Sequence, residues 1–189
     1  MKLVKGLGIL WHRLTQQGVG TTLWWAADHL IRIITGVNIH RLSRITPQVH
    51  VGGQYRRRGI RRMKRRGITA VVNMRIEFDD QAAGIAFPRY LHLPTVDDQA
   101  PTLEHLRLGA SFIADEVERG GEVYIHCGSG IGRAATMAAA YLVTTGLSAD
   151  AAWAKIRESR PFIKPTPPQV ERLKEFAATL ASEGDGQGL

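Results

Sequence analysis

The sequence has very little cysteine: Cys127 is the only one in 189 residues. A single cysteine cannot form an internal disulfide, which excludes the disulfide-stapled folds of small secreted proteins. The thiol is therefore either an inert core group or a reactive one, and both suit a cytosolic setting. On this basis we expect a cytoplasmic protein. The length and a hydrophobic fraction of 44% indicate one ordered globular domain with room for a terminal appendage.

Long hydrophobic runs are also absent. The most apolar stretch, residues 19–37, is interrupted by Asp28, His29 and Arg32. It falls short of the roughly 18 uninterrupted apolar residues that a transmembrane helix needs. Charged residues break up the first 14 residues in the same way, so neither a transmembrane span nor a secretory signal peptide is expected.

The first 44 residues are predicted to form an amphipathic helical extension. Apolar side chains recur at helical spacing in two stripes, Leu3, Leu7, Leu10, Trp11 and Leu14 and then Leu23, Trp24, Ala27, Leu30, Ile31 and Ile34. Such a helix either docks on its own domain or lies on a membrane surface. Asp28 and the modest charge of the extension favour docking, and peripheral membrane contact stays open as the alternative.

The net charge of +8 is concentrated in one segment that lacks acidic residues. Residues 56–66, RRRGIRRMKRR, carry eight arginines and lysines, and the remainder of the chain is close to neutral. The segment is either a solvated helix face or a binding site for anions such as phosphate head groups. Interleaved aromatic residues are missing, so we expect no nucleic-acid partner. Together with the N-terminus, the segment from Arg56 to Arg66 is the candidate for peripheral membrane contact.

Strands and helices are predicted to alternate from residue 48 onward. The strands are 48–54, 68–75, 89–96 and 123–127, and helices are expected at 56–66, after Pro101-Thr102, at 134–146, after Ser148 and from Pro165 onward. This order indicates an α/β domain with a mostly parallel central sheet flanked by helices. We expect a helical extension over 1–44, a catalytic domain over 45–182 and a disordered tail over 183–189.

The stretch HCGSGIGRAA, residues 126–135, carries the chemistry. A strand, a glycine-rich loop and a helix follow one another here, and loop and helix N–H groups converge on an anion in that geometry. The ending Gly-Lys-Ser/Thr of a nucleotide P-loop and the spacing of a dinucleotide fingerprint are both missing. What the loop has is a cysteine at its start and an arginine at its end. The predicted phosphate-binding residues are Gly128, Ser129, Gly130, Ile131, Gly132 and Arg133.

Cys127 and Arg133 suit nucleophilic attack on phosphorus. A helix N-terminus and a guanidinium favour the thiolate over the thiol, and the arginine can clamp two phosphate oxygens. The leaving oxygen needs a proton donor, for which Asp97 in LPTVDDQAP is the candidate and Asp98 the alternative. The product of the first step would be a cysteinyl phosphate that water hydrolyses.

Other polar residues are assigned no chemistry. His50, His92 and His105 lack the spacing of metal ligands, and we expect neither a metal nor a cofactor. Arg75 and Glu77 are interpreted as scaffold.

HCGSGIGR resembles the HCxxGxxR signature of cysteine-dependent protein tyrosine phosphatases, and the chain is similar to their dual-specificity branch over about residues 45–180. YIHCGSGIGRAATMAAAYL, VDDQAPTL and RPFIKPTPPQVERLKEF resemble the group that contains the phosphatidylglycerophosphate phosphatase and its bacterial relatives. The resemblance implies Cys127 as nucleophile, Arg133 as phosphate clamp and Asp97 as general acid. It also implies supporting roles for His126 near the thiolate and for Gln169, which positions water in some members.

Ala134 departs from the family, which carries serine or threonine directly after the arginine. Loss of that hydroxyl predicts slower breakdown of the phosphoenzyme. We expect a monomeric phosphomonoester phosphatase that acts on phosphotyrosine or phosphoserine/threonine in proteins. The alternatives are a phospholipid or phosphoinositide head-group phosphatase and a catalytically weak, phosphate-binding pseudophosphatase.

Overall fold

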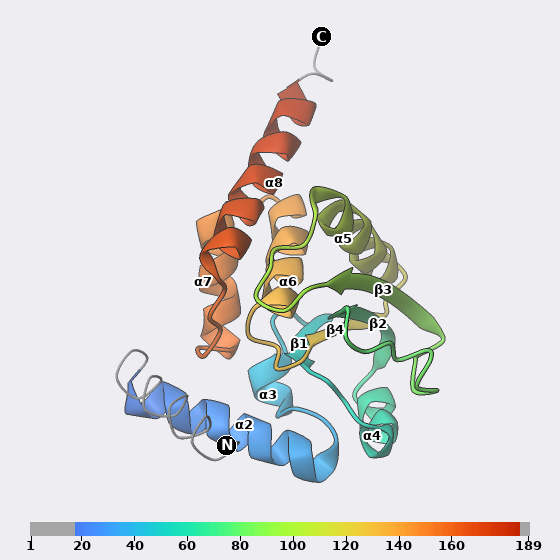
Figure 1. The fold of residues 1–189 in the computed structure, drawn as a ribbon. Helices are drawn as coiled ribbons and strands as arrows, with labels where there is room; N and C mark the ends of the chain where they lie inside the picture. Colours follow the sequence, from blue (N-terminus) through green and yellow to red (C-terminus); the bar gives the residue numbers. More distant parts are fainter. Residues whose placement is uncertain (1–17, 186–189) are drawn as a thin grey trace.

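The computed structural model describes residues 18–185 and contains one four-stranded sheet (Figure 1). The strands are β1 (Val49–Gly53), β2 (Ile68–Arg75), β3 (Arg89–Thr95) and β4 (Glu122–Cys127), and they lie in the order β1-β4-β2-β3. All three neighbouring pairs are parallel. The predicted α/β fold with a parallel central sheet is confirmed.

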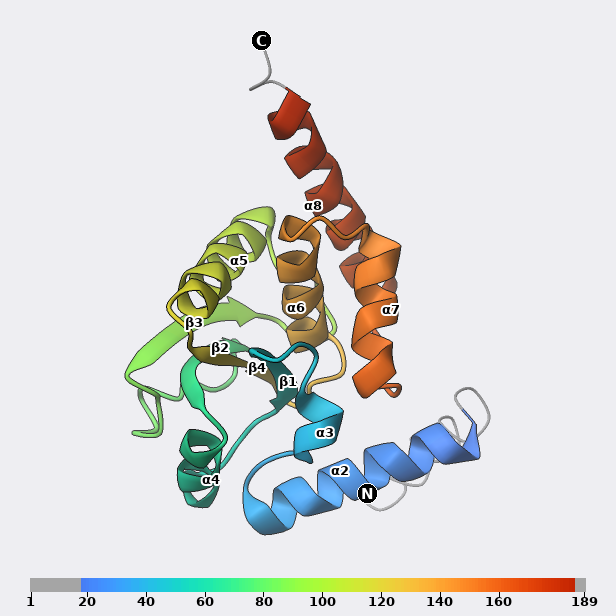
Figure 2. The same ribbon diagram turned by 180° about the vertical axis from the view of Figure 1, so that it is seen from behind.

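Four helices form a layer on one face of the sheet. α5 (Leu103–Glu118) and α6 (Arg133–Thr144) contact the strands, and α7 (Ala149–Ser159) and α8 (Pro167–Asp185) pack against α6. Figures 1 and 2 show α6 in the middle of this layer, between α5 and the α7–α8 pair. Every side chain from Arg133 to Val143 is buried. A helix surrounded on all sides must be narrow, which explains the run of alanines in its sequence.

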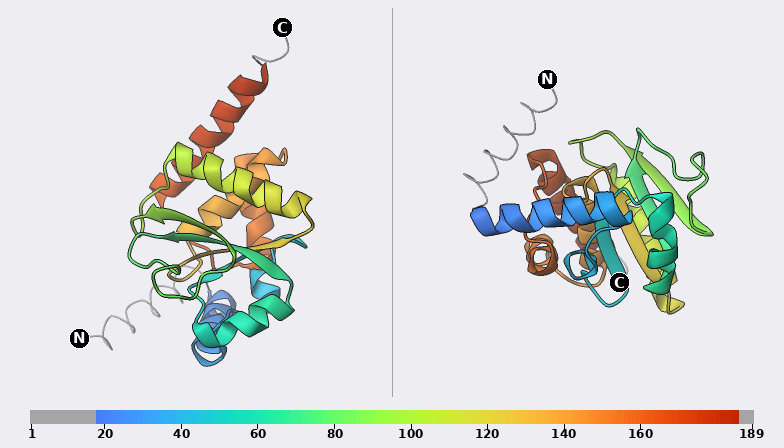
Figure 3. Two further views of the ribbon diagram at one scale, coloured as in Figure 1. Left: turned by 90° about the vertical axis from the view of Figure 1, so that its right-hand side faces the viewer. Right: turned by 90° about the horizontal axis from the view of Figure 1, so that it is seen from below.

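The remaining helices precede β1 or join β1 to β2. The predicted basic helix forms a 3₁₀ turn, η1 (Arg57–Gly59), followed by α4 (Ile60–Arg65). Two N-terminal helices, α2 (Val19–Thr35) and α3 (His40–Ser43), precede β1. In Figures 1–3, α2 and α4 lie at the same end of the molecule.

The helix α2 docks on the domain, but not through its apolar stripe. Leu23, Trp24, Leu30, Ile31 and Ile34 are exposed, whereas Thr22 and Asp28 are buried. The prediction that the stripe faces the domain is wrong. The buried Asp28 carboxylate has partners in the domain and keeps the polar side of α2 facing inward. The first predicted stripe, Leu3 to Leu14, lies outside the described residues.

The C-terminal helix is longer than predicted. It continues through Asp185, so residues 183–185, assigned to a disordered tail, are helical. Glu183 forms two hydrogen bonds with the guanidinium of Arg107 on α5, at 2.5 and 2.9 Å. Within residues 18–185, no helix combines the length and apolar character that crossing a membrane requires.

Candidate active site

The glycine-rich loop joins the carboxyl end of β4 to the N-terminus of α6. Cys127 is the last residue of β4 and is only 3% exposed. The N–H of Gly130 donates to its Sγ at 3.2 Å. Gly130 has φ 71°, and a Cβ there would lie 2.3 Å from the carbonyl carbon of Gly52. The loop can therefore fold back over the thiol only because this residue is glycine.

Arg133 begins α6 and is 1% exposed, yet its guanidinium has several partners at or just beyond the carboxyl ends of β2 and β3. It donates to the Glu77 carboxylate through both terminal nitrogens, at 2.8 and 2.9 Å, and to the Thr95 carbonyl at 2.8 Å. Asp97 Oδ1 lies 2.8 Å from Arg133 Nη2. The Nε–H of Arg133 is buried and has no partner among residues 18–185. This donor is left for an oxygen atom of a bound anion.

Glu77 and Arg133 stabilise each other's charged forms. The hydrogen bonds from Arg133 lower the pKa of Glu77 to about 2, against the opposing effect of partial burial. Burial alone would lower the pKa of Arg133, but the Glu77 carboxylate and the neighbouring Cys127 and Asp97 raise it. The site therefore holds a permanently charged guanidinium beside the thiol.

We expect Glu77→Gln to lose a pH-dependent part of the stability. The pKa of Glu77 is about 2 in the folded chain and about 4.5 without these contacts. The contribution of the ionised carboxylate to folding stability is therefore complete above about pH 4.5 and disappears as pH falls toward 2. Urea unfolding at several pH values should show a stability gap between wild type and variant that narrows across this window. Glu104→Gln, at an exposed residue, is the control. A gap of constant size from neutral pH to pH 3 would contradict the assignment.

The segment that carries Asp97 and Asp98 is held by the start of α8. Thr166 Oγ1 donates to the Asp98 carbonyl at 2.9 Å, and Gln169 Nε2 donates to the Gln99 carbonyl at 3.0 Å. Asp98 has φ 61°, in the left-handed region. Gln169 Oε1 accepts from the N–H of Thr166 at 3.0 Å, so both polar atoms of this side chain bind the backbone.

His126 is completely buried and pairs with a buried carboxylate. His126 Nε2 lies 2.7 Å from Asp80 Oδ2, and both side chains are inaccessible to solvent. Burial would raise the pKa of Asp80, but the hydrogen bond with His126 and that from Gln54 lower it. Gln54 also accepts from Arg75, which in turn donates to Glu77. A continuous polar network therefore connects His126 with Arg133.

Arg160 binds backbone carbonyls of the loop and connects the loop with the N-terminal helix α2. Its guanidinium is fully buried and donates to the carbonyls of Gly130 at 2.7 Å and Ser129 at 3.1 Å. The same group lies 3.2 Å from Asp28 Oδ2 on α2. Asp28 also accepts from Asn38 Nδ2 at 2.5 Å and from the Ile39 N–H at 2.8 Å.

These elements enclose a small polar cleft of about 230 Å³ above the thiol. Its lining comprises Asp97, Asp98, Cys127, Ser129, Ile131, Gly132, Arg133, Lys164 and Gln169. No group of three or more histidine, cysteine or acidic side chains that could hold a metal occurs in the described part of the chain. The arrangement can hold a dianion against a nucleophile, with an acid at the rim.

Of the predicted residues, the cleft is lined by Asp97, Asp98, Cys127, Ser129, Ile131, Gly132, Arg133 and Gln169. The His126 side chain does not line it and contacts Asp80, and both polar ends of Gln169 bind backbone groups, which leaves the expected water-positioning role untested. The structure adds four residues that the sequence interpretation missed. Glu77 was interpreted as scaffold but contacts Arg133 directly, and Asp80, Arg160 and Lys164 were not singled out. Glu77 and Asp80 follow β2, whose carboxyl end lies beside that of β4. Acidic residues just after a predicted strand were the partial signal in the sequence, but that this strand neighbours β4 is known only from the structure.

Comparison with known proteins agrees with this geometry. Residues 49–179 match the family model described as "Dual specificity phosphatase, catalytic domain". Human "Dual specificity phosphatase 28" is 29% identical over 150 residues, which are 78% of this chain and 84% of the relative. Rat "Phosphatidylglycerophosphatase and protein-tyrosine phosphatase 1" is 40% identical over 94 residues, 49% of each chain. The chain covers only 22% of the length of another relative, rat "Protein phosphatase Slingshot homolog 3".

A solved structure described as PTPMT1 in complex with PI(5)P superimposes with a TM-score of 0.69 and 30% identity, covering 75% of this chain and 97% of that one. The family match covers well over half of the chain and includes the whole sheet, the cysteine-to-arginine loop and the start of α8. The chain therefore belongs to the dual specificity phosphatase family.

Proposed function

We propose that the protein hydrolyses phosphate monoesters of phospholipid head groups through a phosphorylated Cys127. The observation that carries the chemistry is the position of the Cys127 thiol under the Gly128–Gly132 loop, beside a buried guanidinium with one donor unused. Loop N–H groups and Arg133 would surround the phosphate oxygens and stabilise the charge that develops on them in the transition state.

The reaction has two steps. In the first, Sγ forms a bond to phosphorus, the bond from phosphorus to the ester oxygen breaks, and Asp97 gives its proton to the leaving alkoxide. In the second, Asp97, now a carboxylate, takes a proton from water, and the resulting nucleophile breaks the sulfur–phosphorus bond. Inorganic phosphate leaves and the thiolate is regenerated. His126, held by Asp80, and Arg160 position the loop.

Two observations favour a lipid substrate. Lys164 adds a second cationic side chain to the cleft that holds Arg133, which suits a head group with more than one anionic group. The relatives include one named as a phosphatidylglycerophosphatase and one whose structure holds PI(5)P. The second candidate is a phosphorylated protein, which the match to human dual specificity phosphatase 28 over most of both chains supports.

A substrate panel tests the choice. Phosphatidylglycerophosphate and phosphoinositides in micelles, and phosphotyrosine and phosphoserine peptides, are compared by phosphate release with the same enzyme preparation. The proposal predicts a higher kcat/KM for a lipid than for any peptide. A peptide that exceeds every lipid would assign the protein substrate instead.

Asp97→Asn is expected to lower turnover of alkyl phosphate substrates about 10²- to 10⁴-fold, because the amide cannot protonate the leaving oxygen. The loss should be smaller for aryl phosphates, whose leaving phenoxide needs less protonation. Asp98→Asn is the matched control, since asparagine tolerates the left-handed backbone at this position. Steady-state rates with both substrate types check the prediction. A larger loss in Asp98→Asn than in Asp97→Asn would make Asp98 the acid.

Ala134 is expected to make the second step slow. The residue is fully buried at the start of α6, and the nearby hydroxyl of Thr136 already donates to the Gly132 carbonyl at 3.1 Å. We expect a burst of product with an aryl phosphate, followed by slow turnover. Ala134→Ser should raise the steady rate about tenfold or more, as one hydrogen bond of about 1.5–3 kcal/mol to the departing thiolate is restored.

The control for that substitution is Ala135→Ser, one residue along the same buried helix. Stopped-flow measurement of burst and steady phases distinguishes the cases. The absence of any burst and of any turnover in the wild type would favour a phosphate-binding pseudophosphatase. Equal effects at positions 134 and 135 would remove the assigned role of the hydroxyl.

A further inference from the structure

The helix α2 presents an apolar surface that the domain does not cover. Leu23, Trp24, Leu30 and Ile34 are 64%, 54%, 56% and 60% exposed, and Ile31 lies between them on the same side. Residues 23, 27, 30, 31 and 34 share one side of a helix. With 17 residues, the helix is about 25 Å long. It lies outside residues 49–179, which match the phosphatase family, so the family fold does not account for it.

The orientation of α2 is fixed by its polar side. Asp28 is buried and pairs with Arg160, and Arg32 Nη1 donates to the Gln54 carbonyl at 3.0 Å. Rotation of the helix to bury its leucines would expose that network and leave Arg160 without its carboxylate. A buried charge left unpaired is strongly unfavourable. The apolar side therefore points outward in the folded protein.

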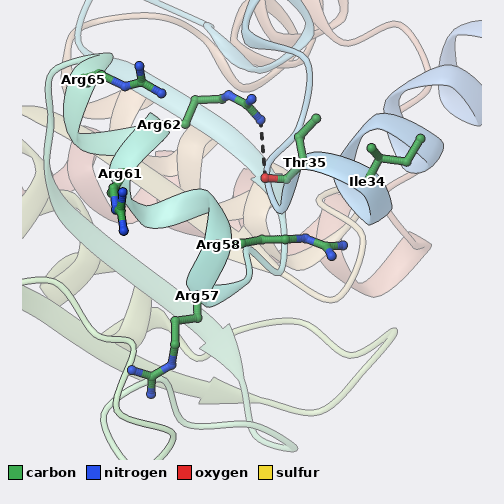
Figure 4. A pocket seen from close by; sticks show the side chains of 7 residues that line it. All are labelled: Ile34, Thr35, Arg57, Arg58, Arg61, Arg62 and Arg65. Carbon is green, nitrogen blue, oxygen red and sulfur yellow. Dashed lines mark hydrogen bonds between the residues drawn. The ribbon is translucent and has the colours of Figure 1, made fainter.

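Arginines continue this surface at the C-terminal end of α2. A hollow of about 870 Å³ is lined by Ile34, Thr35, Arg57, Arg58, Arg61, Arg62 and Arg65, as Figure 4 shows. Arg62 donates to the Thr35 carbonyl at 3.4 Å, which joins the two helices. No acidic residue lines the hollow, and no ion pair involves Arg58, Arg61 or Arg65 in the part of the chain that the structure describes.

Apolar side chains beside unneutralised arginines select a particular kind of partner. Nucleic acid would neutralise the guanidinium groups but leave the leucines and isoleucines in water. An anionic bilayer satisfies both, because its acyl region accepts the apolar side chains and its head groups pair with arginine. We propose that α2 and the arginines of η1 and α4 form a docking surface for an anionic phospholipid membrane, with α2 lying in the plane of the head groups.

The test is co-sedimentation of the full chain with vesicles of phosphatidylcholine alone and of phosphatidylcholine with one third phosphatidylglycerol. Phosphatidylglycerol has no phosphate monoester, so binding is independent of the proposed substrate and of catalysis. The wild type should bind the anionic vesicles, bind the neutral ones far less, and dissociate at high salt. Turnover of a soluble aryl phosphate by every variant checks that the catalytic domain is intact.

Two matched pairs of variants locate the surface. Leu30→Glu should reduce partitioning about tenfold or more, whereas Leu108→Glu, at a leucine of α5 that is 51% exposed, should not. Arg58→Glu with Arg61→Glu should reduce partitioning about 30-fold or more. Arg119→Glu with Arg157→Glu makes the same change in net charge on other elements. This control should bind the anionic vesicles much more strongly than the variant with Arg58→Glu and Arg61→Glu.

Several results would overturn the proposal. One is a wild type that stays in the supernatant with anionic vesicles, and another is binding by Leu30→Glu and the arginine variant at the wild-type level. Binding only after removal of residues 1–17 would show that this segment occupies α2 in the full chain. A dimer that Leu30→Glu dissociates, without vesicle binding, would assign the surface to a second copy. Arginine-dependent binding of an oligonucleotide, without vesicle binding, would assign it to nucleic acid.

Discussion

Cys127→Ser is expected to abolish turnover, with a fall of about 10⁴-fold or more, as loss of an enzyme's nucleophile does elsewhere. The serine hydroxyl occupies nearly the same space under the loop, and the Gly130 N–H that donates to Sγ can donate to it. It is not ionised near neutral pH, however, and a neutral hydroxyl is a weak nucleophile. His126 Nε2 is committed to Asp80.

The same variant should still bind phosphate and its analogues. The loop N–H groups, the α6 N-terminus and Arg133, which would hold the anion, are unchanged in this variant. Calorimetric titration with inorganic phosphate or tungstate, beside an assay of aryl phosphate hydrolysis, separates the two properties. Binding without turnover is the expected pair of results. Undiminished hydrolysis by Cys127→Ser would exclude the cysteine mechanism.

Arg133→Lys is expected to lower kcat/KM about 10²- to 10³-fold for every phosphate monoester. A lysine keeps the charge but not the planar group whose terminal nitrogens hold Glu77 and the Thr95 carbonyl while its Nε–H is left for a phosphate oxygen. The loss should appear mainly in kcat, because the arginine contacts matter most as charge builds on the equatorial oxygens. Glu77 would lose part of its pairing, so a lower melting temperature is also expected.

The control is Arg119→Lys, an exposed residue at the end of α5. Steady-state kinetics with an aryl phosphate and a thermal melt on each protein test the prediction. A lysine variant with wild-type kcat would show that Arg133 is held by Glu77 as a structural pair and does not contact the reacting phosphate.

The sequence predicted the fold and the loop because both depend on local order. The parallel sheet follows from alternating strands and helices, and residues 127–133 are contiguous, so their mutual geometry comes with the chain. Asp97 could be placed only because a strand and a proline-started helix flank it. These parts needed no knowledge of which strands are neighbours.

Contacts between residues that follow different strands could not be predicted from the sequence. Glu77 and Asp80 become part of the site because β2 lies next to β4, and nothing in the spacing of residues 77, 80, 126 and 133 states that order. The outward face of α2 was mispredicted for a related reason. Periodicity shows that a helix has two unlike sides, but the buried pair between Asp28 and Arg160, 132 residues apart, decides which side faces the domain.

Rapid acid quench followed by intact mass and peptide mapping detects a phosphorylated Cys127 directly. Wild-type protein is mixed with an excess of aryl phosphate and stopped during the burst that Ala134 is expected to produce. A cysteinyl-phosphate intermediate with slow breakdown predicts one added phosphate on nearly every chain, located on Cys127, and far less of it in Ala134→Ser. Hydrolysis that proceeds with no phosphate on Cys127 at any time point would contradict it.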